Sequence, residues 1–139
     1  MPLQLTFDCA DPHAQARFWA AALDYVVEDH DEVVGQAVDA GFVAADSDDI
    51  IDIDGRRAWR AYASAKARAT EDRLLFQAVP EAKSAKNRLH LDLHPGEAQR
   101  DAKVGQLLEL GATKLWDGQL GPQTWVTLAD PEGNEFCVA

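Results

Sequence analysis

The stretch NRLHLDLH, residues 87–94, is the most informative about the fold, because it alternates leucine with polar or ionisable residues. In a β-strand, successive side chains point to opposite faces. The two faces would carry Leu89, Leu91 and Leu93, and His90, Asp92 and His94. The alternation therefore predicts a strand over residues 88–94 with an apolar face and an ionisable face.

The same pattern occurs once more, at LQLTFDC, residues 3–9. Its polar face would hold Gln4, Thr6 and Asp8. Each strand leads into an amphipathic helix. The first follows Asp11 and Pro12, a good N-cap and a residue tolerated at the first helical position; the second spans residues 96–112 and stops at Gly111.

Three strands are expected after each helix. In the second half they are TKLWD, TWVTLAD and NEFCVA, the last two joined by the turn DPEGN. In the first half we expect YVVEDH, one strand running from DIIDID to AWRAYA, and RLLFQAV. The spacing of valine and alanine in DEVVGQAVDAGF predicts an inserted helix near residues 31–41.

The chain therefore reads as two copies of one unit, strand, helix and three strands. We predict a single α+β domain over residues 1–139, with modules at roughly 1–80 and 87–139. The leucine rows would pack on the helices and the polar rows would line a concave cleft. An alternating strand of this kind can also leave its polar face open to solvent.

Charge and cysteine content narrow the function. With 24 acidic and 13 basic residues the net charge is −11, which disfavours nucleic acid and membrane surfaces and favours a cationic ligand or simply solubility. Cys9 and Cys137 belong to no metal or redox motif, and the first residues lack a secretory signal. We therefore expect a cytoplasmic location.

Four segments resemble the glyoxalase-like branch of the vicinal oxygen chelate superfamily, which also includes bleomycin-resistance proteins and dioxygenases. They are FDCADPHAQARFWAAALDY, LLFQAVPEAKSAKNRLHLDLHPGE, LLELGATKL and WVTLADPEGNEFCV. The resemblance implies paired βαβββ modules that form an open, curved mixed-sheet barrel with helices on its outer face. It also implies a small-molecule cleft, a divalent metal (Zn, Ni, Fe or Mn) and a homodimer.

Carried over position by position, the resemblance implies the metal ligands Gln4, Gln77, His90 and Cys137. Gln4 and His90 each stand seven residues before an acidic residue at a helix start, Asp11 and Glu97. Cys137 occupies the place where metal-dependent members carry glutamate. Two amides, one imidazole and one thiol are a poor set for a hard divalent ion, and His90 could serve instead as a general base or hydrogen-bond donor. In a rival interpretation, the row His90, Asp92 and His94 binds the metal, and two adjacent members of this row coordinate one ion.

The expected cleft residues and functions complete the prediction. Trp59 and Trp125 suit either a pocket wall or a dimer interface. The cleft would contain Gln4, Thr6, Gln77, His90, Asp92, Trp59, Trp125, Glu135 and Cys137. We expect the cleft to bind a small oxygenated metabolite. Three functions are then open. They are metal-assisted chemistry of the lyase or isomerase type, sequestration of a cationic antibiotic, and association of a degenerate member with a protein partner.

Overall fold

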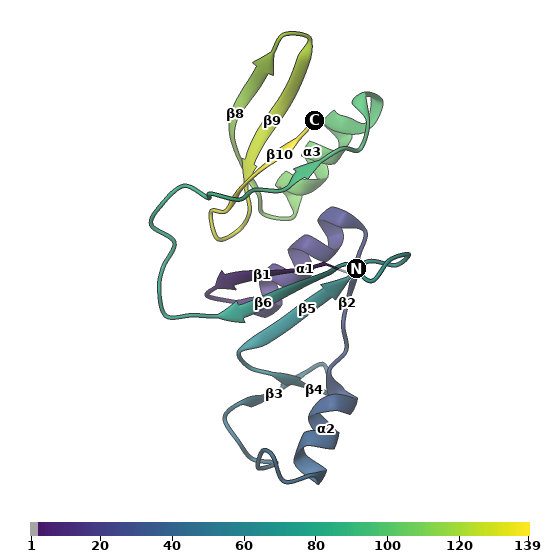
Figure 1. Cartoon of the computed structure of the whole chain (residues 1–139), viewed down its shortest axis with the longest axis vertical. Coiled ribbons are helices and arrows are strands. Elements are labelled where there is room, and N and C mark those ends of the chain that lie inside the picture. Colours follow the sequence, from purple (N-terminus) through teal and green to yellow (C-terminus); the bar gives the residue numbers. More distant parts are fainter. Residues whose placement is uncertain (1–2) are drawn as a thin grey trace. The chain divides into compact units, whose positions relative to one another are not determined.

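The computed structural model describes residues 3–139, which form two compact units. One unit ends at Pro80 and the other begins at Glu81. Each contains a mixed four-stranded sheet that does not close on itself, with a helix packed against it (Figure 1). The predicted α+β class is confirmed, as are the helix after each first strand and the inserted helix, whereas two of the predicted strands differ as described below. None of the helices in these residues has the length and apolar character of a membrane span.

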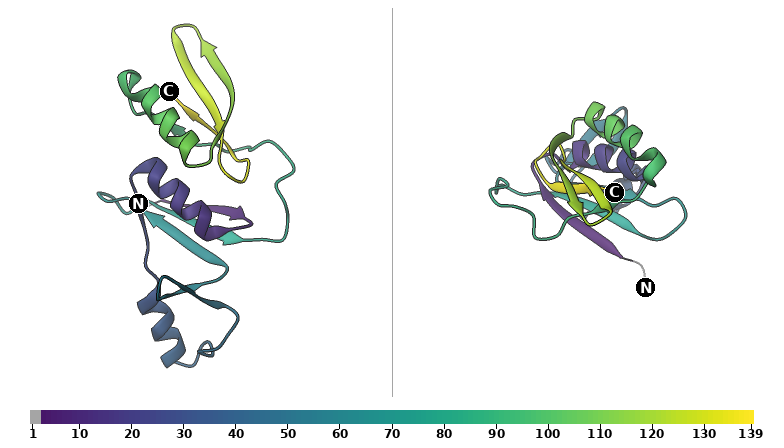
Figure 2. Two further views of the ribbon diagram at one scale, coloured as in Figure 1. Left: turned by 180° about the vertical axis from the view of Figure 1, so that it is seen from behind. Right: turned by 90° about the horizontal axis from the view of Figure 1, so that it is seen from above.

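The described residues of the first unit form six strands and two helices. Its sheet has the order β1-β6-β5-β2, with β1 and β6 parallel, and α1 packs on β5 and β6. The inserted helix α2 packs on the two-stranded hairpin of β3 and β4 (Figure 2). The elements are β1 (Gln4–Cys9), α1 (Pro12–Leu23), β2 (Val26–Val27), α2 (Asp31–Asp39), β3 (Ile50–Ile53), β4 (Arg56–Trp59), β5 (Tyr62–Lys66) and β6 (Arg73–Ala78).

The second unit repeats the first without the insertion. Its sheet has the order β7-β10-β9-β8, with β7 and β10 parallel and the other pairs antiparallel. The helix buries Val104 and Leu107, and the sheet buries Leu128, Phe136 and Val138. The elements are β7 (Asp92–Leu93), the 3₁₀ turn η1 (Glu97–Gln99), α3 (Arg100–Glu109), β8 (Thr113–Leu120), β9 (Gln123–Ala129) and β10 (Glu135–Val138).

Local sequence signals explain several boundaries. The Asp11 carboxylate accepts a hydrogen bond of 2.9 Å from the Ala14 N–H and so caps α1 as predicted. In the turn between β9 and β10, the buried Asp130 carboxylate accepts from the backbone N–H groups of Glu132 and Asn134, both at 2.9 Å. This turn fixes the register of the last two strands.

The strand expected over residues 88–94 is much shorter in the structure. Only Asp92–Leu93 forms a paired strand, which meets its partner β10 at Cys137 and Val138. Leu93 is buried as predicted, whereas the Leu89 side chain is 67% exposed. The leucine face predicted from alternation is therefore wrong at Leu89.

The single strand expected from DIIDID to AWRAYA is also wrong. The chain reverses at Asp54 and Gly55, which have φ values of 53° and 80°, and forms the β3–β4 hairpin before β5 begins. An Asp-Gly pair favours this turn because both central residues need positive φ. The reversal moves Trp59 into a hairpin outside the four-stranded sheet.

Candidate functional site

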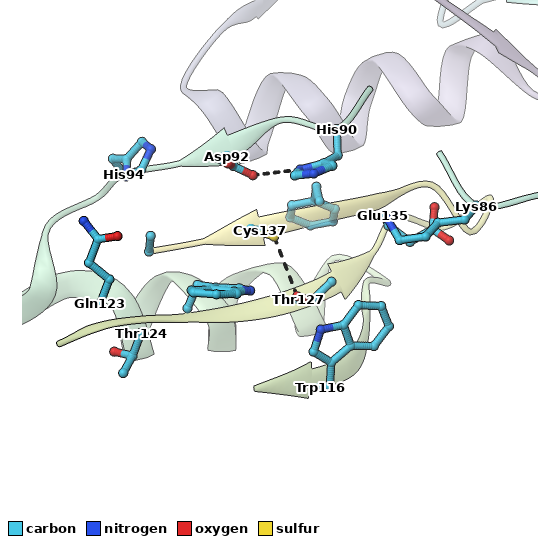
Figure 3. A pocket seen from close by; sticks show the side chains of 13 residues that line it. Lys86, His90, Asp92, His94, Trp116, Gln123, Thr124, Thr127, Glu135 and Cys137 are labelled. Carbon is cyan, nitrogen blue, oxygen red and sulfur yellow. Dashed lines mark hydrogen bonds and ion pairs between the residues drawn. The ribbon is translucent and has the colours of Figure 1, made fainter. Parts of the chain in front are cut away.

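A cavity of about 610 Å³ lies on the second unit's sheet, on the face opposite the buried leucines. All four strands of that sheet or their ends contribute to it (Figure 3). Its wall is formed by Lys86, His90, Asp92, His94, Trp116, Gln123, Thr124, Trp125, Thr127, Glu135, Phe136, Cys137 and Ala139. This volume is in the range of small-molecule sites.

Strand register places the central side chains in one row across the sheet. Asp92 of β7 pairs with Cys137 of β10, Cys137 with Thr127 of β9, and Thr127 with Trp116 of β8. Paired residues share a face. Polar groups from three strands and an indole from the fourth thus meet at the cavity although they are far apart in sequence.

His90, Asp92 and Cys137 form the chemical centre of this row. His90 Nδ1 and Asp92 Oδ1 are 2.9 Å apart, and one ligand atom from each of the three residues lies within 4.8 Å of the others (Figure 3). An ionised carboxylate only accepts hydrogen bonds, so Nδ1 donates and the imidazole Nε2 keeps a lone pair when His90 is neutral. The cluster offers nitrogen, oxygen and sulfur donors at one point.

The Cys137 thiol is held in its protonated form. Burial raises its pKa, the nearby Asp92 carboxylate raises it further, and a hydrogen-bond contact of 3.6 Å with Thr127 Oγ1 opposes both. The thiolate, not the thiol, is the nucleophile and the metal ligand. The site is therefore not a preformed thiolate nucleophile, and metal binding at Cys137 would release a proton.

Glu135 lies at the edge of the cavity and is tied to the chain before β7. Its carboxylate accepts from the Asn87 backbone N–H at 3.0 Å and forms an ion pair with Lys83 at 3.1 Å. The Asn87 hydrogen bond is the main reason that its pKa falls to about 2. Glu135 is thus engaged in holding residues 83–87 against β10.

The structure brings together five of the predicted cleft residues, His90, Asp92, Trp125, Glu135 and Cys137. His94, named in the rival metal interpretation, also lines the cavity. The other four lie in the first unit. Their places are Gln4 and Thr6 on β1, Gln77 on β6 and Trp59 on β4.

Gln4 and Gln77 are not neighbours within the first unit. Gln4 stands opposite Arg73 and accepts a hydrogen bond of 2.7 Å from it, whereas Gln77 stands opposite Asp8 and donates to its carboxylate at 2.8 Å. If β1 and β7 are matched so that Gln4 corresponds to His90, the registers equate Cys137 with Leu75 and Gln77 with Ala139. Leu75 thus takes the place that the sequence comparison gave to Gln77.

Trp116 and Thr127 are the main cavity residues that the sequence reading missed. Thr127 shares its parity with Trp125, so alternation along TWVTLAD could have found it. Trp116 could not be found in this way, because the register shifts between Lys114 and Trp116. Such a bulge turns every later side chain of the strand to the opposite face.

Comparison with known proteins decides the family. The profile described as a glyoxalase-like domain matches residues 4–139. The chain belongs to this family. The solved structures below show that this glyoxalase-like chain shares their fold, and no curated protein matches it.

Three solved structures illustrate the similarity of fold. A glyoxalase/bleomycin resistance protein/dioxygenase family enzyme from Burkholderia phytofirmans has a TM-score of 0.63 at 12% identity, covering 97% of this chain and 94% of that one. A fosfomycin resistance protein from Mesorhizobium loti gives 0.60 at 12% identity, with 98% and 87% covered. That of Listeria monocytogenes, complexed with Mn(II) and 1S,2S-dihydroxypropylphosphonic acid, gives 0.59 at 9% identity, with 96% and 83% covered.

Proposed function

We propose that this glyoxalase-like chain binds a divalent transition metal at His90, Asp92 and Cys137, and with it a small oxygenated metabolite in the adjoining cavity. The observation that supports this is the clustering of three different donor atoms within 4.8 Å. A related fold, the Listeria protein, holds Mn(II) together with a small diol compound.

The donor set fits zinc better than it fits Mn²⁺ or Mg²⁺. Imidazole nitrogen, carboxylate oxygen and thiolate sulfur are all zinc ligands, and catalytic zinc sites keep three protein ligands and one open position. Thiolate disfavours the harder ions. When bound, such an ion acts as a Lewis acid on the oxygens of the metabolite.

The surrounding residues would bind and orient the organic part of the ligand. Trp116 and Trp125 supply apolar surface on the β8–β9 side of the cavity, and the Thr127 hydroxyl contacts the Cys137 sulfur. Lys86 adds a cation at the wall, where it suits an anionic group of a metabolite. Lyase- or isomerase-type chemistry, with His90 as ligand or base, and a homodimer are part of this proposal.

Cobalt(II) titration tests the proposal, because a cobalt–thiolate bond gives a charge-transfer band in the near ultraviolet. We expect about one ion per chain with this band, and a loss of affinity of roughly a hundredfold in His90→Ala and Cys137→Ser. His94→Ala is the matched control, because His94 lines the cavity outside the cluster. Binding without the band, or binding unchanged in Cys137→Ser, would overturn the metal site.

Sequestration of a cationic molecule is the second candidate, favoured by the net charge of −11 and by two carboxylates and two indoles at the cavity. In this case the metal-free protein would be stabilised by a cationic antibiotic through ligand linkage. Bleomycin is a suitable probe. A rise in Tm with bleomycin that Trp125→Ala abolishes, in a protein that takes up no cobalt, would favour this candidate.

A further inference from the structure

Gly118 of β8 lies directly beneath the indole of Trp125. The two residues are paired across the β8–β9 ladder. A Cβ atom on Gly118 would stand 2.1 Å from Trp125 Cε2, 2.3 Å from Nε1 and 2.4 Å from Cζ2. Such distances are far below van der Waals contact, so the indole occupies the space that any other residue's side chain would need.

Space, not backbone conformation, is the reason for glycine at this position. Six glycines of the described chain have positive φ, and Gly118 is not among them. Its backbone belongs to an ordinary strand that any residue can adopt. A glycine in a strand otherwise weakens it and marks a close approach of another group. Here that group is the Trp125 ring.

The position of the ring decides the width of the cavity. Trp125 extends over β8, away from β10, which carries Cys137. On the β10 side, continuing the β9–β10 register by one residue places Ala139 opposite Trp125. Ala139 has a small side chain and also lines the cavity. Trp125 thus has a place to lie on β8, and the space toward Cys137 stays open.

We infer that Gly118 is a specificity-determining residue that seats the Trp125 indole on β8 and so sets the largest ligand the cavity accepts. This inference rests on the proposed function, that the cavity holds a small molecule next to His90, Asp92 and Cys137. A side chain at position 118 would displace the ring toward β10 and exclude bulky ligands while sparing small ones.

The seat itself can be tested without any ligand. In ¹H–¹⁵N spectra, the Trp125 indole signal, assigned from Trp125→Phe, should move strongly in Gly118→Ala. The variant should also lose about 5 °C or more in Tm, and Trp125→Ala added to Gly118→Ala should recover most of this loss, because it removes the clash. Gly105→Ala is the matched control, since nothing lies within 4 Å of a Cβ there. An unmoved signal, or a loss that Trp125→Ala does not relieve, would overturn the seat.

The effect on specificity is tested with two chelators of different size on the zinc-loaded protein, acetohydroxamate and 2,3-dihydroxynaphthalene. Gly118→Ala should weaken the larger chelator at least tenfold and change the smaller by less than twofold, and adding Trp125→Ala should restore the larger. Equal weakening of both chelators would contradict the inference. If wild-type protein takes up no zinc, the metal proposal fails, and the indole and Tm results still decide whether Gly118 seats the ring.

Discussion

The two sheets have the same strand order and pairing, yet their polar faces are used in opposite ways. In the first sheet the polar groups bind one another, and in the second they line a cavity. The matched central rows are Thr6, Leu75 and Ser64 in the first sheet and Asp92, Cys137 and Thr127 in the second. Topology alone therefore does not make a site.

Arg73 links the polar groups on the polar face of the first sheet. Its guanidinium donates to Glu28, to Gln4 at 2.7 Å and to the fully buried Ser64 hydroxyl at 2.9 Å. Burial alone would raise the pKa of Glu28, but the hydrogen bonds from Ser64 and Arg73 outweigh it and lower the pKa. At the corresponding position the second sheet has Glu135, which instead accepts a hydrogen bond from Asn87 and pairs with Lys83.

The largest effect is expected from Cys137→Leu, which gives the second sheet the residue that the first sheet has at the matched position, Leu75. The cluster would lose its sulfur donor, and we expect cobalt or zinc affinity to fall by roughly a hundredfold with the fold intact. Isothermal titration and circular dichroism measure the two effects. The reverse change, Leu75→Cys, is the control and should create no metal site in the first sheet. Metal affinity retained in Cys137→Leu would show that the comparison misplaces the site.

The second prediction breaks the network of the first sheet. Arg73→Met would leave Glu28 and Ser64 without their cationic partner, and we expect a loss of about 2 kcal/mol in the free energy of unfolding. Asp92→Asn in the second sheet should cost less than about 0.5 kcal/mol, because its pair with His90 is exposed. Urea denaturation compares the two variants. Equal losses would mean that the two faces contribute alike to stability.

A third prediction concerns acid. The pKa of Glu135 is about 2 in the folded protein against an ordinary value of 4.5, so its contribution to stability is present above pH 4.5 and is lost as the pH falls toward 2. We expect Glu135→Gln to remove up to about 2 kcal/mol at pH 7 and to flatten the decline in acid. Urea denaturation of metal-free protein from pH 7 to pH 2.5 measures this. A decline just as steep in the variant would contradict it.

The smallest expected effect sharpens the description of Cys137. Because the pKa of Cys137 is raised, iodoacetamide should alkylate it slowly at pH 7. The rate should keep rising with pH beyond the pH at which the rate of an ordinary thiol levels off. Asp92→Asn should speed the reaction a few-fold at pH 8, since it removes a nearby negative charge, whereas Thr127→Val should slow it. Mass spectrometry separates Cys137 from the buried Cys9. Rapid alkylation at pH 6 would refute a protonated resting thiol.

Sequence patterns were sufficient wherever a residue's role depends on its neighbours along the chain. The Asp11 cap, the helices at α1 and α2, the turn DPEGN and the strands β8, β9 and β10 all follow from spacing and local hydrogen bonding. The candidate centre was found partly in this way. His90 and Asp92 share a polar row, whereas Cys137 was named only through the family resemblance, at the place where metal-dependent members carry glutamate.

Other features escaped because they depend on how strands pair. Alternation predicted a long strand at residues 88–94, but only Asp92 and Leu93 pair with β10. The bulge before Trp116 turns the indole of that residue toward the cavity. The β1–β6 register places Leu75, not Gln77, at the position that matches Cys137. One-residue differences in register exchange the faces of a strand, and no local pattern determines them.

Periodicity, capping and turn residues are enough to predict the two repeated units and the ionisable row that begins with His90, and the family was predicted from the resemblance of four segments. Strand pairing, which these patterns do not contain, places the candidate site on the second sheet. Asp92, Cys137 and Thr127 meet because three strands pair in one register, whereas the matched row of the first sheet is Thr6, Leu75 and Ser64, with Arg73 hydrogen-bonded to Ser64. Hydrogen bonds between distant strands, which no local pattern contains, make that choice.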